Sequence, residues 1–206
     1  MREKPEEKYI RMTQIESGYW QQGLIVAGID EAGRGPLAGP VFTGCVVLDP
    51  DTKILGIDDS KKLSEKKREA LYEEILAKAR FARIGRAEPE EIDSVNILQA
   101  TKNAMERAAE GSGAHIYLID SVKGLHLPGQ CVPRDHADAD SYMVAAASIL
   151  AKVGRDRLMK EMDLLYPQYG FARHKGYGTA EHIAAIRQYG PCPIHRMSFI
   201  QKFLEK

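Results

Sequence analysis

The chain has 206 residues, which is enough for one large domain or for one domain with a small appendage. Its hydrophobic content of 44% and charged content of 28% are typical of a soluble globular protein, and its 29 basic and 29 acidic side chains give a net charge that neither favours nor excludes a polyanionic partner. The sequence has three cysteines without C-x-x-C spacing, Cys45, Cys131 and Cys192, which argues against a disulfide framework or a zinc knuckle. It has no apolar run of about 18 residues and no signal-peptide core, which argues against a membrane helix. Together these features predict a soluble cytoplasmic protein.

The N-terminal third of the chain begins with an arm and continues into a buried strand. Residues 1–22 are charged and poor in strand-forming residues, so we expect an arm or a short helix that leads into the domain. Residues 24–29 (LIVAGI) form an apolar run with β-branched side chains, which predicts a buried strand. That strand stops at two consecutive carboxylates, Asp30 and Glu31, and the sequence GRGP at 33–36 then predicts a tight turn with unpaired backbone amides.

Strands alternate with helices along the rest of the chain. The hydrophobic patterns predict strands at 41–48, 81–87 and 115–119, and helices at 65–80, 95–109, 142–165, 180–189 and after residue 195. We expect a turn at 89–92, an irregular segment at 121–136, and an apolar stripe of Leu71, Ile75 and Leu76 on the first helix. The order of elements predicts an α/β domain with a mixed sheet and a small helical C-terminal part, about residues 166–206.

Four carboxylates lie at the ends of predicted elements. Asp30 and Glu31 end the first strand, Asp120 ends the strand at 115–119, and Asp138 opens the longest helix. Two adjacent acids before a glycine turn are often only a solvated turn, but here the strand is too apolar for that interpretation, because a buried carboxylate costs several kcal/mol unless it is paired or binds metal. A turn acid remains an alternative for Asp120, and a helix N-cap remains one for Asp138.

Carboxylates that converge on one point repel one another unless a cation is bound. Oxygen ligands select hard ions such as Mg²⁺ or Mn²⁺, and two of these ions about 3.5–4 Å apart activate a water molecule and stabilise the leaving oxygen of a phosphodiester. The bare amides of the glycine turn, beside Arg34, suit a phosphate. Lys61 and Lys62, just before a helix N-terminus, predict either an anion site or a solvated charge cluster.

Several motifs together resemble the ribonuclease HII family, the type 2 ribonucleases H. GIDEAGRGPLAGPV at 28–41 is similar to the N-terminal signature of that family almost letter for letter. Further motifs follow in the order of the family: IDDSKKLSEKKRE at 57–69, YLID at 117–120, AAASILAKVGRDR at 145–157, HKGYGT at 174–179 and HRMSF at 195–199. The resemblance covers residues 24–199.

This resemblance implies a ribonuclease H-like catalytic domain over residues 23–206, after an N-terminal arm at 1–22. It implies a monomeric endonuclease that cuts the RNA strand of RNA–DNA hybrids, and also cuts 5′ of single ribonucleotides in duplex DNA, leaving 3′-hydroxyl and 5′-phosphate ends during ribonucleotide and primer removal. The implied cofactors are two Mn²⁺ or Mg²⁺ ions. The implied catalytic and metal-binding residues are Asp30, Glu31, Asp120 and Asp138.

The fourth acid is assigned by its distance from a second motif. The family's aspartate stands ten residues before the serine of A-S-I-L-A-K, which is Ser148 here, so the corresponding residue is Asp138. Asp140 departs from the family pattern, and it either caps the helix or tunes metal affinity. The resemblance also implies that Gly33, Arg34 and Gly35 contact the sugar-phosphate and its 2′-hydroxyl. It further implies that Tyr177 stacks near the RNA–DNA junction and that Lys61 touches phosphate.

Two other functions are weighed against this hypothesis. A phosphotransferase would use the glycine turn for a nucleotide, but GRGPLAG lacks the lysine of a P-loop. A module that binds hybrids without cutting them would not need intact carboxylates.

Overall fold

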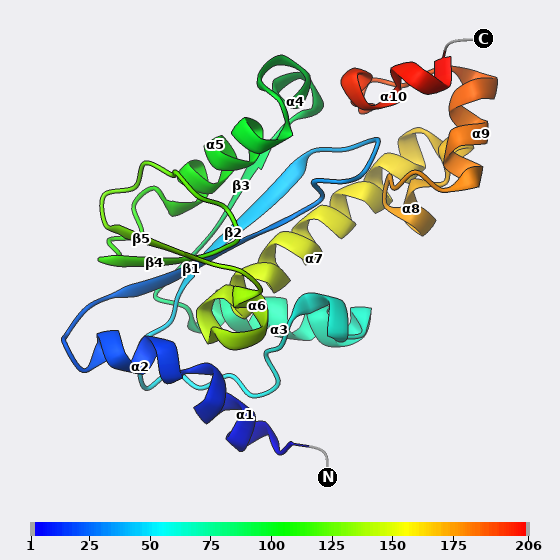
Figure 1. Ribbon diagram of the computed structural model, residues 1–206. Helices are drawn as coiled ribbons and strands as arrows, with labels where there is room; N and C mark the ends of the chain where they lie inside the picture. The colour runs from blue at the N-terminus through cyan, green and yellow to red at the C-terminus, as the bar shows by residue number, and fades with distance from the viewer. Residues whose placement is uncertain (1–2, 205–206) are drawn as a thin grey trace.

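The protein is built around one five-stranded mixed sheet, seen in the computed structural model, which describes residues 3–204 (Figure 1). The strand order is β3-β2-β1-β4-β5. Strand β1 pairs antiparallel with β2 and parallel with β4, β2 pairs antiparallel with β3, and β4 pairs parallel with β5. The strands are β1 (Val26–Ala32), β2 (Val41–Val47), β3 (Phe81–Ala87), β4 (Ile116–Asp120) and β5 (Gln130–Arg134).

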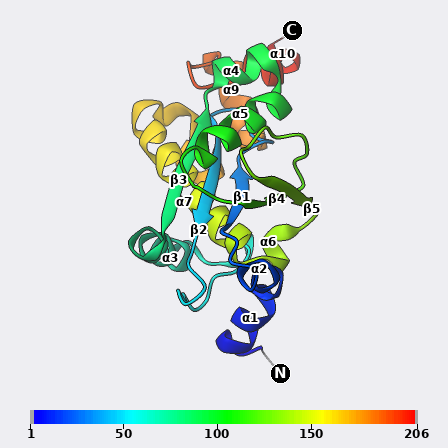
Figure 2. The ribbon, with the colours of Figure 1, turned by 90° about the vertical axis from the view of Figure 1, so that its left-hand side faces the viewer.

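Helices cover both faces of this sheet (Figure 2). The helices are α1 (Pro5–Met12), α2 (Gln14–Trp20), α3 (Glu65–Lys78), α4 (Pro89–Val95), α5 (Ile97–Ala109), α6 (Ala137–Asp140), α7 (Tyr142–Leu165), α8 (Phe171–His174), α9 (Ala180–Tyr189) and α10 (Met197–Leu204), with short 3-10 turns η1 (Ser60–Lys62) and η2 (Pro167–Tyr169). Helix α7 packs on β1 and β2, and α5 packs on the opposite face against β3 and β2.

The long helix α7 lies unusually close to the sheet, which places its N-terminal half in the core. A Cβ atom added to Gly28 on β1 would lie 2.1 Å from the backbone carbon of Met143, so only glycine fits there. The alanine-rich sequence that follows on α7 is buried throughout and forms one core cluster with residues of β1 and β2. Close packing of small residues therefore fixes the start of α7 against the strand that carries Asp30.

Most predicted elements are confirmed, and the predicted mixed α/β fold with C-terminal helices is correct. Three local expectations are wrong. The segment at 121–136 is not wholly irregular, because it contains the edge strand β5; residues 89–92 are not a turn but begin helix α4; and Leu76 is exposed rather than part of the apolar stripe. Ser64 caps α3 and Thr179 caps α9. Cys45 is buried in the core, whereas Cys131 and Cys192 are half-buried, and all three are free thiols.

The N-terminal arm folds as two helices, α1 and α2, which pack beside α6 and below the sheet (Figure 1). Met12 and Glu16 from this arm are fully buried. The predicted domain boundary between residues 22 and 23 stays a prediction, and its outer limits at residues 1–2 and 205–206 fall outside the described residues. In residues 3–204, no helix has both the length and the apolar character needed to cross a bilayer.

Candidate active site

Four acidic side chains gather at one end of the central strands, and we call them the carboxylate cluster: Asp30, Glu31, Asp120 and Asp138. The register explains why they meet. Ile29 on β1 lies opposite Ile119 on the parallel neighbour β4, so the acid that follows each isoleucine leaves the sheet at the same level. The single-turn helix α6 then brings Asp138 to the same place, since the amide of Ala137 donates to Asp120 Oδ1 at 2.9 Å.

Burial dominates the electrostatics of the first two acids. Asp30 is 5% exposed, and the only hydrogen bond to its carboxylate in the described chain comes from the amide of Glu31, at 2.7 Å. Loss of hydration raises the pKa of Asp30 well above its ordinary value, and the charges of Glu31, Asp120 and Asp138 raise it further. Burial also raises the pKa of Glu31, although Arg34, whose Nη1 lies 3.4 Å from Glu31 Oε1, opposes that rise.

Asp138 forms an ion pair with a lysine and does not cap a helix. Lys61 Nζ lies 3.5 Å from Asp138 Oδ2, and loss of hydration raises the pKa of Asp138 while the Lys61 charge opposes it. The residue that caps α7 is Ser141, whose hydroxyl accepts from the amide of Val144 at 3.2 Å. The N-cap alternatives for Asp138 and Asp140 are therefore wrong. The other lysine of the pair, Lys62, faces Asp59 at 4.0 Å instead.

The cluster has the donor chemistry of a site for hard divalent ions. Glu31 Oε2 is a buried carboxylate oxygen that accepts no hydrogen bond in the described chain. Such an oxygen is costly unless it binds a cation, so it suits a metal ligand. All four side chains offer oxygen only, which selects Mg²⁺ or Mn²⁺ over softer metals. Among residues 3–204, no three such side chains already have the spacing that holds one ion, so water molecules or substrate oxygens would complete its coordination.

The glycine loop at residues 33–35 presents bare amides beside the cluster. The amides of Gly33, Arg34 and Gly35 donate to no other group in the described part of the chain. Gly33 has a φ of 96°, and an added Cβ would lie 2.0 Å from Arg155 Nε, so neither the conformation nor the space admits another residue. Unpaired donors in a tight turn suit an anionic oxygen.

Two fully buried arginines support the glycine loop and the segments beside it through backbone carbonyl groups. Arg196 donates to the carbonyls of Gly33, Arg34 and Gly39 at 2.6, 2.8 and 2.8 Å. Arg155 donates to three further carbonyls of the loops around the site, at 2.9–3.1 Å. Burial lowers the pKa of both guanidiniums, yet both stay charged at neutral pH. Because the C=O and the N–H of a trans peptide point in opposite directions, the amides of Arg34 and Gly35 point away from Arg196.

Tyr177 stands on the far side of the glycine loop. The residue is 47% exposed. Its ring lies 3.8 Å from the Cβ position of Gly35, and the guanidinium of Arg155 is 6.0 Å from the ring centroid. A cavity of about 340 Å³ separates Tyr177 from Asp30 and Glu31, and the glycine loop and Lys61 line it too. Asp120 and Asp138 lie beside this cavity rather than in its lining.

Four lining residues were not predicted as site residues: Ala32, Ser60, Lys152 and Arg155. Arg196, behind the loop, was also missed. The two arginines and Lys152 lie in AKVGRDR and HRMSF, two of the motifs that resemble the ribonuclease HII family. A signal was available, because an arginine within a predicted buried helix or directly before one needs a fixed polar partner.

Two buried histidines support the backbone of Tyr177. His195 Nδ1 accepts from the amide of Cys192 at 2.9 Å, so its proton is on Nε2, which lies 3.0 Å from His182 Nε2. His182 must then carry its own proton on Nδ1, which donates to the carbonyl of Tyr177 at 2.9 Å. We call this the histidine relay. Burial lowers the pKa of His195 to about 4 and that of His182 below its ordinary value, so both rings are neutral at pH 7.

Known proteins share the sequence and the fold. A family model described as Ribonuclease HII matches residues 27–202. Ribonuclease HII of Acetivibrio thermocellus is 49% identical over 98% of this chain and 80% of its own length, and that of Desulfitobacterium hafniense is 53% identical over 89% and 72%. The crystal structure of ribonuclease H2 from Pyrococcus horikoshii OT3 superposes with a TM-score of 0.74 at 26% identity, covering 89% of this chain and all of the other.

Proposed function

Because the chain belongs to the ribonuclease HII family, and is thus a metal-dependent endoribonuclease that hydrolyses the RNA strand of RNA–DNA hybrids, we propose that the carboxylate cluster performs this hydrolysis with two divalent ions. The observation that carries the proposal is the unpartnered, buried Oε2 of Glu31 among three further carboxylates. Two divalent ions also balance the charge of four carboxylates, which a single ion would leave in mutual repulsion.

The residues of the site divide the work between metal binding and substrate binding. We assign Asp30, Glu31, Asp120 and Asp138 to hold Mg²⁺ or Mn²⁺. When bound, such a pair of ions lowers the pKa of the attacking water and stabilises charge on the leaving oxygen. Lys61, 77% exposed at the side chain, is free to shift from Asp138 to a substrate phosphate once cations neutralise the cluster. Arg34, paired with Glu31, can do the same.

The glycine loop and Tyr177 supply the recognition of ribose. The unpaired amides of Gly33, Arg34 and Gly35 can contact the 2′-hydroxyl and the neighbouring phosphate. The 2′-hydroxyl is the group that distinguishes RNA from DNA. The half-exposed ring of Tyr177, across the cavity, can stack on the next sugar. This arrangement supports cleavage 5′ of a single ribonucleotide in duplex DNA, with 3′-hydroxyl and 5′-phosphate products, and a role in ribonucleotide and primer removal. Action as a monomer in the cytoplasm stays a prediction.

The test uses three substrates of identical sequence: an RNA–DNA hybrid, a DNA duplex with one embedded ribonucleotide, and an all-DNA duplex. With Mg²⁺ or Mn²⁺ we expect both ribonucleotide-containing strands to be cut, the second at one bond, and EDTA to stop both reactions. Cleavage that survives EDTA would refute the metal assignment. An intact single-ribonucleotide duplex would refute the recognition part alone.

A further inference from the structure

The segment that carries Asp138 is too short to hold its own shape. Helix α6 has four residues, His136 before it has a φ of 60°, and Ser141 after it is extended. An isolated helical turn is unstable in water, because nucleation fixes several dihedral angles for one hydrogen bond. The position of Asp138 is therefore set by contacts from elsewhere in the fold.

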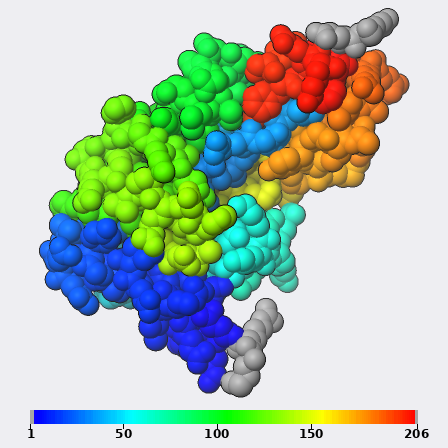
Figure 3. All heavy atoms as spheres, viewed as in Figure 1, coloured from blue at the N-terminus to red at the C-terminus, as the bar shows by residue number. Residues whose placement is uncertain are grey.

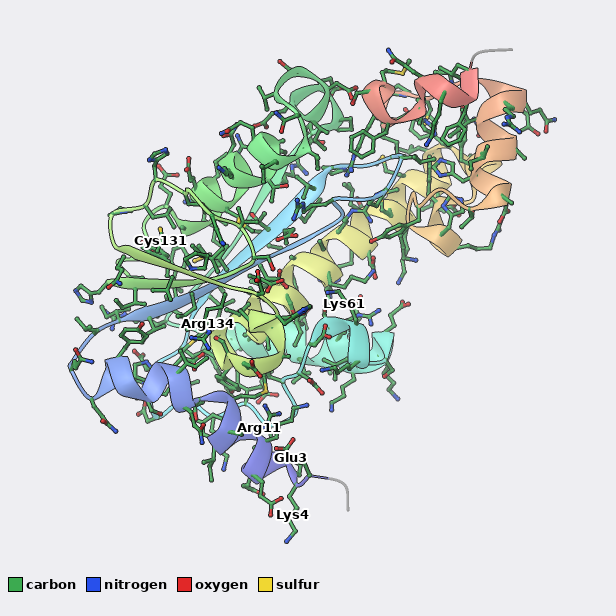
Figure 4. The ribbon with its side chains drawn as sticks, in the orientation of Figure 1. Glu3, Lys4, Arg11, Lys61, Cys131 and Arg134 are labelled. Carbon is green, nitrogen blue, oxygen red and sulfur yellow. The ribbon has the colours of Figure 1, made fainter. Side chains whose placement is uncertain are left out.

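The N-terminal arm supplies these contacts on one side. Glu16 Oε1 accepts from the hydroxyl of Ser141 at 2.6 Å and from the amide of Met143 at 3.0 Å. Arg11 Nη1 lies 3.4 Å from the carbonyl of Ala139, the residue directly after Asp138. Arg11 and Lys61 lie on different sides of α6 in Figure 4, and the space-filling view shows the dark-blue arm directly against the yellow-green segment (Figure 3).

Glu16 has the surroundings of a fixed anchor. The whole residue is buried, and its second oxygen, Oε2, accepts no hydrogen bond in the described chain. A carboxylate in this condition is costly, so its contacts with the start of α7 must offset much of that cost. The location suits a negative group, because it lies at the N-terminus of the 24-residue helix α7, where the helix dipole is positive. The adjacent Tyr9 ring packs edge-on against Tyr142, 5.1 Å between centroids, and holds the arm in place.

We propose that the N-terminal arm, through Glu16 and secondarily Arg11, is a positioning element that sets Asp138 in place for metal binding. This inference rests on the proposed function, since it takes Asp138 as a metal ligand. The arm ends before residue 27, so it lies outside the part of the chain that the family model matches. The arm acts through the backbone on either side of Asp138, and the alignment with the Acetivibrio thermocellus relative, which covers 98% of this chain, extends over it.

The experiment measures Mn²⁺ binding by calorimetry without substrate, hydrogen exchange of the backbone at 136–143, and the Mn²⁺ concentration that gives half-maximal hybrid cleavage. The full chain is compared with Glu16→Ala, with the isosteric Glu16→Gln, and with Ile92→Ala, a buried position on α4 that controls for lost stability. Glu16→Ala should weaken Mn²⁺ binding and raise the half-maximal concentration by about ten- to a hundredfold, the usual loss for a residue that orients a ligand.

Hydrogen exchange at 136–143 should accelerate in Glu16→Ala. The Mn²⁺ affinity of Glu16→Gln should stay within a few fold of wild type, because its amide oxygen still accepts hydrogen bonds. Ile92→Ala should bind Mn²⁺ normally despite a lower melting temperature. If Glu16→Ala does not fold, Arg11→Met removes the contact with Ala139 from a half-exposed side chain and should give a shift of a few fold. Normal Mn²⁺ binding in the arm variants, or equal weakening in Ile92→Ala, would overturn the inference. Asp138→Asn separates the two proposals: full activity there refutes the proposed function, whereas an inactive Asp138→Asn beside a normal Glu16→Ala refutes only the role of the arm.

Discussion

Replacing Asp30 by asparagine should abolish cleavage and at the same time stabilise the metal-free protein. The substitution keeps the shape of the side chain and an oxygen that accepts from the amide of Glu31, at 2.7 Å in the wild type. It removes one negative charge from a buried position that faces three other carboxylates. Catalysis and stability should therefore move in opposite directions.

The magnitudes follow from burial. An unpaired buried carboxylate costs several kcal/mol of folding free energy. The hydrogen bond from Glu31 offsets part of this cost, and removing a remaining cost of about 2 kcal/mol would raise the melting temperature by about 4–8 °C for a chain of this size. The loss of a metal ligand removes several kcal/mol of transition-state stabilisation, and about 4 kcal/mol corresponds to a roughly thousandfold slower reaction.

The pH dependence fixes the sign of the stability change. Burial raises the pKa of Asp30 above its ordinary value, so the folded state prefers the protonated side chain. Stability is therefore lost as the pH rises from the ordinary pKa of an aspartate toward the raised pKa of the folded state. The advantage of Asp30→Asn should thus be largest at neutral pH and shrink in acid. Calorimetric melting in EDTA from pH 4 to 8 and single-turnover hybrid cleavage test both parts. Cutting at near the wild-type rate, or a lower melting temperature at pH 7, would refute the reasoning.

Three further predictions concern binding and stability. Lys61→Ala should lower the salt dependence of hybrid affinity by about one unit of log–log slope, whereas an unchanged slope would leave this lysine only its contact with Asp138. Tyr177→Ala should cut the single-ribonucleotide duplex about ten- to a hundredfold more slowly, with a smaller loss on a long hybrid, and equal rates would make the ring structural. Burial lowers the pKa of His195 to about 4, so the folded protein favours the neutral ring. The stability that this preference contributes is present above about pH 6.5 and is lost as pH falls toward 4. His195→Gln should therefore flatten the fall in melting temperature between those two pH values.

The sheet and the carboxylate cluster were predictable because their signals are local. An apolar run that stops at an acid gives both a strand and the side chain at its end, and the periodicity of α7 predicted its bounds, Tyr142–Leu165, correctly. Strand β5 was not predictable in the same way. Its sequence QCVPR contains a proline, its side chains are exposed or half-buried, and the strand exists because β4 offers it an edge. Likewise, Pro89 was interpreted as a turn residue but stands at the first turn of α4.

The supporting residues could not be found from local patterns. Arg196 and Gly33 are 163 positions apart, and no periodicity connects them. In the sequence Glu16 is one of many charged residues in the arm. In the structure it is buried against Ser141 at the start of α7, although the two residues are 125 positions apart. Such partners become evident only when the topology is known, because the residues that they bind are distant in the sequence and are mostly bound through backbone groups, which carry no sequence signal.

The grip of Arg196 on the glycine loop has a consequence for biosynthesis. The guanidinium that fixes the carbonyls of the loop comes from a residue that is translated 163 positions after Gly33. At about 5–20 residues per second, a nascent chain spends many seconds with its sheet emerging and its loop still unfixed. We expect ribosome-bound chains stalled at increasing lengths to gain nuclease activity only after Arg196 has left the exit tunnel, and activity at shorter lengths would contradict this order. A cell that makes such a nuclease would then receive it inactive until Arg196 has been synthesised and has left the ribosome.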